Sequence, residues 1–262
     1  MTRYGWIIVA GIAAAMAAGC GGEISPQARQ ALQNGYDAYR GGDDAAAVRI
    51  LDEFILWNND TPRTAEAYYL RGLARYRLKQ TDTAGKDFQA AAEKATEPSV
   101  RAHAMAALGD LAYDRDDALQ AERLYRQALA DTPRGTSPAD QAHYRLGCLL
   151  QQQGRWAEAD LQFSRVMYLF KESPLARLSA DRLHAVAWTI QAGLYADKSQ
   201  AVAKAQQFRA EPLAAQARAV LGGDGQTAYA VQVGRYSTIE QARSQLAAVR
   251  VRCKDAVIIT MR

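Results

Sequence analysis

The sequence of 262 residues predicts a multidomain protein, with an all-α helical repeat array followed by a small α+β domain. Two observations predict this fold class. Glycines recur with apolar residues and prolines every 37 or 38 residues through the middle of the chain. Near the C-terminus, an eight-residue pattern ending in Gly-x-Tyr occurs at Trp188–Tyr195 and again at Tyr229–Tyr236, each time before a helical pattern. Repetition on both scales indicates modules rather than one continuous core.

Residues 1–19 have the composition of an export signal. Arg3 supplies a positive charge, and the uncharged stretch Tyr4–Ala18 is too short for an ordinary transmembrane helix. Small residues directly before Cys20 resemble the lipobox of bacterial lipoproteins, although Ala17 replaces the usual leucine. The resemblance implies lipidation and cleavage at Cys20, which leaves residues 20–26 as a lipidated linker. An ordinary signal peptide cleaved nearby is the alternative.

Gly21 stands where an acidic residue would retain such a lipoprotein in the inner membrane. By this resemblance, we expect the lipid anchor at Cys20 to lie in the outer membrane and the protein to face the periplasm. The other cysteines fit export, because Cys148 and Cys253 fall in different predicted domains and no disulfide framework is expected.

The charge distribution excludes one class of partner. Residues 186–262 contain ten Lys/Arg and five Asp/Glu, a net charge of +5, while residues 20–185 contain 21 and 23, a net charge of −2. The basic excess is modest and dispersed, whereas nucleic-acid binding requires a clustered basic stripe. We therefore expect no nucleic-acid partner.

The repeat array is predicted over residues 27–179. Its repeated glycines are separated by 37, 37 and 38 residues and are Gly35, Gly72, Gly109 and Gly147. Twelve residues after each glycine stands an alanine, at 47, 84, 121 and 159. Sixteen residues after each stands a large residue: Leu51, Phe88, Tyr125 or Phe163. Small residues let paired antiparallel helices approach closely, while the large ones fill the seam between pairs.

This pattern resembles the tetratricopeptide repeat, with each period longer than that family's 34 residues by three or four. The resemblance implies a concave groove for an unidentified envelope protein. The side chains expected there are Tyr36, Tyr39, Tyr69, Tyr76, Tyr113, Tyr144, Arg40 and Arg77. Tyrosine offers apolar area together with a hydrogen-bonding tip. The alternative is that several of these tyrosines only pack between neighbouring helices.

Residues 186–262 predict a βαββαβ domain, an antiparallel sheet with helices on one face and the other face open. After the first copy of the pattern, Asp197 is a plausible helix N-cap. After the second, Ser237–Glu240 reads as a capping box. Two further strands are expected near residues 217–221 and 256–261, and Gly222–Gly225 supplies the turn between the halves.

Strand alternation places Ile190 and Ala192 on the helix-covered side, and Thr189 and Gln191 on the other. In the second copy the same alternation exposes Gln232, whose amide can donate and accept hydrogen bonds. Binding a sugar requires both hydrogen-bond donors and acceptors, because each sugar hydroxyl can act as either. A solvated face without a ligand remains the alternative. Trp188 falls on the apolar side, so it is more plausibly a core residue than a platform for a sugar ring.

The two copies resemble the Val-Gln-x-Gly-Ser-Phe pattern of the SPOR (sporulation-related repeat) domain. That resemblance implies binding of peptidoglycan glycan strands stripped of their stem peptides. The glycan-binding residues would be Gln191, Gln232, Thr189 and Arg235. The chain departs from the pattern at Leu194, which replaces the serine of the first copy, and at Arg235 in the second. The missing serine hydroxyl puts affinity in question more than fold.

We expect no enzyme, no metal and no cofactor. His103, His143 and His184 lie on separate predicted elements, without metal-ligand spacing or a nearby nucleophile pattern. The predicted function is an outer-membrane lipoprotein scaffold that binds glycan strands and partner proteins, in cell-envelope organisation or division. The alternative is a protein-interaction lipoprotein of outer-membrane assembly whose C-terminal domain binds no glycan. The sequence contains no acidic-pair or metal motif that would indicate a peptidoglycan hydrolase.

Overall fold

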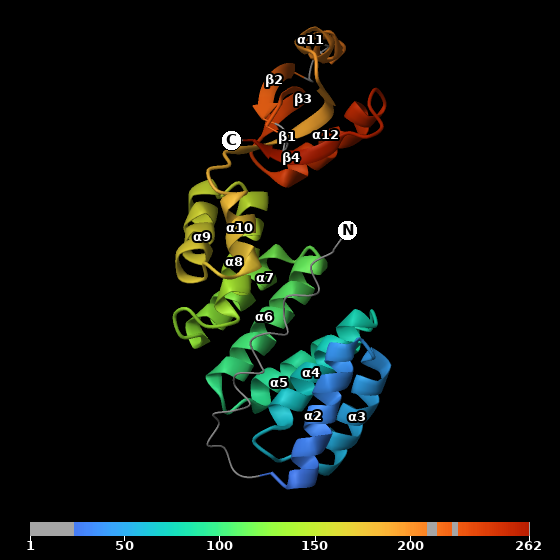
Figure 1. Cartoon of the computed structure of the whole chain (residues 1–262), viewed down its shortest axis with the longest axis vertical. Coiled ribbons are helices and arrows are strands. Elements are labelled where there is room, and N and C mark those ends of the chain that lie inside the picture. Colours follow the sequence, from blue (N-terminus) through green and yellow to red (C-terminus); the bar gives the residue numbers. More distant parts are fainter. Residues whose placement is uncertain (1–23, 209–213, 222–224, 262) are drawn as a thin grey trace. The chain divides into compact units, whose positions relative to one another are not determined.

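The computed structural model describes residues 24–208, 214–221 and 225–261. They fall into two compact units. The first contains the described residues up to Leu146 together with Arg165–Ala176, and the second contains Gly147–Ser164 together with the described residues from Arg177 onward. In Figure 1 the helical repeats run from blue to yellow, and the sheet with its two helices runs from orange to red. Cys20 and the stretch that the sequence predicts to be an export signal lie outside the described residues.

The repeat array consists of helical hairpins, as predicted. Their helices are α2 (Pro26–Gly41), α3 (Asp44–Trp57), α4 (Thr64–Arg77), α5 (Thr81–Lys94), α6 (Pro98–Asp114), α7 (Ala118–Asp131), α8 (Ala139–Gln152) and α9 (Trp156–Leu169), followed by α10 (Pro174–Ala180). Two of the recurring prolines, Pro98 and Pro174, begin helices, where the missing N–H costs nothing. The other two, Pro62 and Pro133, lie in the loops between hairpins.

The repeated glycine marks the closest approach of the two helices in each hairpin. A Cβ added to Gly72 would lie 2.6 Å from the ring of Phe88. The same addition would lie 2.7 Å from the side chain sixteen residues later at Gly35, Gly109 and Gly147. Real Cβ atoms are not found so close to other carbon atoms. The spacing of sixteen residues in the sequence therefore records a direct helix–helix contact.

Replacing Gly109 by alanine is expected to destabilise the first unit by about 1–3 kcal/mol, because the new methyl group would overpack the core. The ring of Tyr125 is fully buried, and its hydroxyl donates to Asp110 at 2.7 Å, so the ring has little freedom to move. Gly85→Ala is the matched control. Its Cβ would lie 3.5 Å from Leu111, so the better helix propensity of alanine should add about 0.5–1 kcal/mol. Urea denaturation followed by circular dichroism measures both, and the same sign for both variants would contradict the account.

A second periodic feature lies in the turn within each hairpin. The residue seven positions after each repeated glycine has a left-handed backbone, with φ of 86° at Gly42, 64° at Lys79, 58° at Asp116 and 78° at Gly154. This conformation ends the first helix and lets the second fold back. Because two of the four positions carry side chains, a search for recurring glycines misses the feature.

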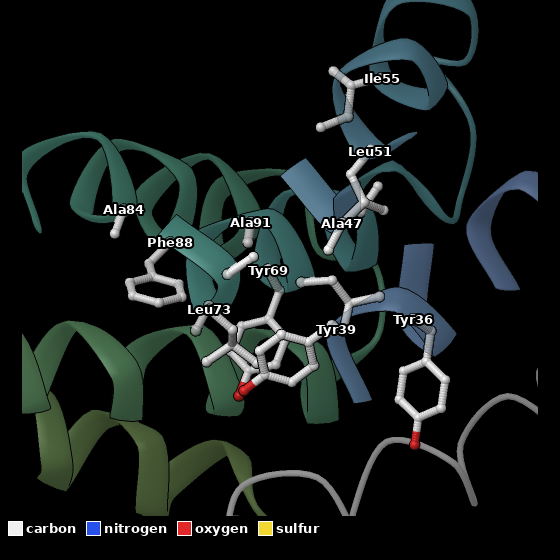
Figure 2. Packing of buried hydrophobic residues seen from close by; sticks show 14 of the residues in the cluster. Tyr36, Tyr39, Ala47, Leu51, Ile55, Tyr69, Leu73, Ala84, Phe88 and Ala91 are labelled. Carbon is white, nitrogen blue, oxygen red and sulfur yellow. The ribbon is translucent and has the colours of Figure 1, made fainter. Parts of the chain in front are cut away.

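Buried apolar side chains join the first two hairpins (Figure 2). Leu51 and Phe88 lie in this cluster with Tyr39 and Tyr69. An ion network borders it: two N–H groups of Arg71 bind the buried carboxylate of Asp87, and Arg75 binds the same carboxylate. The network ties α4 to α5 within the second hairpin.

The C-terminal domain has the predicted βαββαβ order. Strands β1 (Ala187–Tyr195), β2 (Ala215–Leu221), β3 (Thr227–Tyr236) and β4 (Val257–Met261) form an antiparallel sheet in the order β2-β3-β1-β4. Helices α11 (Lys198–Gln206) and α12 (Ile239–Arg250) connect β1 to β2 and β3 to β4. Residues of both helices share one buried cluster with Ile190, Val231 and Val233, so both helices cover the same sheet face.

The N-cap of α11 is the predicted one, whereas that of α12 is shifted by one residue. Asp197 caps α11, accepting a hydrogen bond from the Gln200 amide, as predicted. The capping box of α12 is formed by Thr238 and Gln241 instead of Ser237 and Glu240. The shift by one residue arises because Thr238 is still extended, with φ of −119° and ψ of 159°. The predicted turn at Gly222–Gly225 lies outside the described residues except for Gly225.

Within the second unit, the turn between α8 and α9 packs against the start of β1. The indole N–H of Trp188 donates to the Gln151 carbonyl at 2.9 Å, and the rings of Trp156 and Trp188 lie 5.8 Å apart. A Cβ on Gly154 would lie 2.7 Å from the Ser237 carbonyl oxygen. Residues 147–164 are therefore part of the same compact unit as the sheet.

Candidate functional site

The face of the sheet opposite the two helices carries a row of glutamines. Gln191 of β1 pairs with Gln232 of β3, which pairs with Gln216 of β2. Their neighbours along the strands, such as Ile190 and Val233, belong to the helix-covered cluster, so the three amides project from the other face. The row crosses three adjacent strands.

Gln216 is a candidate site residue that the sequence analysis missed. Its strand begins at Ala215, two residues before the predicted start at 217. Ala215 and Ala217 pack toward the helices, while Gln216 and Arg218 are exposed. The alternation of alanine with polar residues was the available signal, but alanine is too small and too common in helices to mark a strand.

Gln232 has the least ordinary environment in the row. Strand alternation predicted an exposed Gln232, but the residue is only 5% exposed, and its Oε1 atom is buried without a hydrogen-bond partner among the described residues. A buried polar atom left without a partner costs about 1–3 kcal/mol. Gln191 beside it is half-buried. The row therefore includes a buried acceptor that has no hydrogen bond within the described residues.

Thr189 does not offer a hydroxyl to a ligand, which corrects its predicted binding role. It is fully buried, and its Oγ1 donates to the Gly234 carbonyl at 2.8 Å. At this point β3 has an extra residue relative to β1, because Trp188 pairs with Tyr236 while Ile190 pairs with Val233. Thr189 thus supports a β-bulge in β3, and Arg235, which follows Gly234 there, is exposed.

The glycine of each Gly-x-Tyr pattern is required by the tyrosine two residues later. A Cβ on Gly193 would lie 2.9 Å from the Tyr195 ring, and a Cβ on Gly234 would collide with Tyr236. Gly234 also has φ of 71°, which favours glycine. Between glycine and tyrosine, Leu194 is 55% exposed and pairs with Ala230, a neighbour of the glutamine row.

Trp188 is a core residue and not a platform for a sugar ring. It is buried, and its indole N–H is bonded to Gln151. The sequence left open whether Trp188 is a core residue or a platform for a sugar ring, and the structure supports the core residue. Its ring packs on Trp156, beside the last helical hairpin.

In the repeat array, three of the predicted groove tyrosines are buried. Tyr36, Tyr39 and Tyr69 belong to the core cluster and offer almost no surface to a partner (Figure 2). This corrects their assignment to a groove and agrees with the alternative of packing between helices. Arg77 lies over the Tyr39 ring and pairs with Asp44, and Arg40 lies over the Tyr36 ring.

The tyrosine four residues after the glycine connects consecutive repeats. Tyr39 contacts Arg77 of the next hairpin, the hydroxyl of Tyr76 donates to Asp114, and Arg145 lies over the Tyr113 ring. Burial, followed by the contact with Asp114, raises the pKa of Tyr76 well above its usual value, so this hydroxyl stays a neutral donor. Tyr76 and Tyr113 are half-buried, as is Tyr144 on α8. These three keep some surface for a partner.

No group of three or more His, Cys, Asp or Glu side chains in the described parts of the chain could hold a metal ion. Cys148 and Cys253 form no disulfide, and the Cys253 thiol donates to the Ala192 carbonyl. None of the described helices combines the length and apolar character needed to cross a membrane.

Comparison with known proteins finds one family match, at the C-terminal end of the chain. Residues 185–260 match the family model of the SPOR domain. Among solved structures, a tetratricopeptide repeat protein from Parabacteroides merdae is similar at 18% identity and a TM-score of 0.49, over 60% of this chain and 59% of that one. The crystal structure of MamA is similar at 20% identity and a TM-score of 0.46, over 55% of this chain and 79% of that one. No curated protein matches the sequence.

Proposed function

We propose that this protein is a non-enzymatic envelope scaffold that binds peptidoglycan glycan strands, stripped of stem peptides, through the open face of its SPOR domain. The buried, unpartnered Oε1 atom of Gln232 carries the proposal. Once the Gln232 amide turns outward, a sugar hydroxyl could donate to this atom and supply the hydrogen bond that it lacks among the described residues.

The row of three glutamines suits a polymer better than a single small molecule. Adjacent strands lie about 4.8 Å apart, so the amides of Gln191, Gln232 and Gln216 span about 10 Å. Each amide offers a donor and an acceptor, as sugar hydroxyls do. The exposed guanidinium groups of Arg218 and Arg235 add hydrogen-bond donors. Leu194 contributes apolar area where the family pattern has a serine.

The repeat array supports a second role in binding a protein. The proposed partner surface is the half-buried set Tyr76, Tyr113 and Tyr144 on the first helices of hairpins two to four. We further propose that the chain is anchored by lipid at Cys20 in the outer membrane, facing the periplasm, where it would connect the membrane to the cell wall during envelope organisation or division. The lipobox-like residues before Cys20 support this proposal.

Gln232→Ala is expected to weaken sedimentation with isolated sacculi about tenfold, the loss of roughly 1.4 kcal/mol that one hydrogen bond to the glycan would supply. The measurement uses the chain from Ile24 onward, without lipid, over a range of sacculus concentrations. Gln206→Ala is the control, since Gln206 is an exposed glutamine on α11. Equal binding by both variants would remove Gln232 from the site and overturn the observation that carries the proposal. Absence of sedimentation by the unmodified chain would favour the protein-interaction alternative.

A further inference from the structure

Two large apolar side chains are exposed at the end of α3. Leu56 and Trp57 are 71% and 76% exposed, directly after the buried residues Phe54 and Ile55. The helix turns them away from the core. A tryptophan is costly to leave in water, because it presents a large apolar surface along with its single N–H group.

Trp57 lies beside the point where the described chain begins. A depression of about 440 Å³ between α2 and α3 is lined by Trp57 and also by Ser25, the N-cap of α2. Cys20 precedes Ser25 by five residues. Five extended residues span at most about 18 Å, so lipidation at Cys20 would hold this end of the first hairpin close to the bilayer surface.

We propose that Leu56 and Trp57 insert into the headgroup region of the membrane and set the orientation of the repeat array on it. The proposal rests on the lipid anchor proposed above. Tryptophan favours the membrane–water interface, and the strength of such contacts scales with the apolar area buried.

The attraction would be apolar and not electrostatic. Glu53 lines the same depression, and the nearby Asp52 is paired with Arg71 and Arg75. Neither carboxylate would draw this end of the protein to anionic lipids. These carboxylates offset the cations Arg29 and Lys94 at the same end of the hairpin, so the contact should respond to salt much less than one made by a basic patch.

Quenching by brominated lipid tests the proposal on the lipidated full-length protein in phosphatidylethanolamine/phosphatidylglycerol vesicles. The mature chain has three tryptophans, Trp57, Trp156 and Trp188, so the difference from a Trp57→Phe variant isolates the emission of Trp57. We expect brominated lipid to remove most of this emission, with little difference between low and high salt. As a control, Leu119→Trp in the Trp57→Phe background places an indole at another exposed position, 82% exposed, on α7. Its emission should persist.

The outcomes separate this inference from its premise. Protein that floats with the vesicles while the Trp57 emission is unquenched would overturn the membrane contact and leave the anchor intact. Protein that does not float would overturn both. Equal quenching of Trp57 and of the tryptophan introduced at position 119 would also overturn the proposal, because the contact would then be unspecific.

Discussion

Replacing Trp188 by alanine is expected to destabilise the C-terminal unit by about 3–5 kcal/mol, the usual cost of removing a buried tryptophan from a core. The substitution removes the contact with the Trp156 ring and leaves the Gln151 carbonyl without its indole donor. Trp188→Phe should cost less, because it keeps most of the ring volume and loses the hydrogen bond.

Hydrogen exchange measured residue by residue is the suitable readout, because two compact units need not unfold together. In Trp188→Ala, amides of β1 and β3 should lose protection, while those of α4 and α5 keep it. The variant Trp57→Phe, at an exposed position, should leave both sets unchanged. A loss of less than 1 kcal/mol in β1 for Trp188→Ala would contradict the assignment of Trp188 to the core.

The expected loss of stability has a consequence for experiments on the C-terminal domain. The side-chain amide of Gln151 is fully buried, donates to the Arg182 carbonyl at 2.9 Å and accepts from the Arg182 guanidinium at 3.2 Å. A fragment beginning after α10 would lack Gln151 and Trp156 and would expose Trp188. Binding measurements therefore belong on a chain that retains residues 147–164.

Replacing Glu66 by glutamine is expected to stabilise the first unit by about 3 kcal/mol at pH 8 and by little at pH 4. Burial raises the pKa of Glu66 from 4.5 to about 7. The Arg63 guanidinium lies 3.0 Å from Oε2 and lowers the pKa, but this oxygen has no partner of hydrogen-bond geometry among the described residues. At 1.36 kcal/mol per pH unit, this pKa difference corresponds to about 3 kcal/mol.

The sign follows from proton binding. Between pH 4.5 and about 7 the folded state retains a proton at Glu66 that the unfolded state has released, so stability falls as pH rises through this range. Glutamine is neutral throughout and removes this dependence. The measurement is the difference in unfolding free energy between the variant and the unmodified protein from pH 4 to pH 8, which cancels other titrating groups. A difference that stays constant with pH would contradict the burial of an ionised Glu66.

The helical array was predictable because its pattern records direct contacts. The repeated glycine contacts the large residue sixteen positions later in every hairpin. Because the same contact needs the same pair of residue types, it appears in the sequence as a fixed spacing. The groove was less predictable. Tyr39, Tyr76 and Tyr113 occupy one repeat position, but the sequence does not reveal that this position faces the next repeat. Periodicity identifies equivalent residues without giving the direction of their side chains.

In the C-terminal domain, alternation gave the correct sheet face for Ile190 and Gln191, because strand geometry leaves only two directions. It could not show that the Thr189 hydroxyl is used within the sheet, because this group bonds to a β-bulge that no local sequence pattern indicates. Gln151 could not be anticipated either. It stands in a run of polar residues that reads as solvent-exposed, and its contact with Trp188 joins residues 37 positions apart.

The most direct test of glycan binding compares sacculi before and after an amidase removes the stem peptides. The proposed site reads sugar hydroxyls through Gln191, Gln232 and Gln216, so stripping the peptides should expose more ligand. The chain from Ile24 onward should sediment with untreated sacculi and should sediment more strongly with treated ones. The increase should be lost in the double variant Gln191→Ala, Gln232→Ala. Sedimentation no greater than that of an unrelated control protein, with either preparation, would contradict the proposed function.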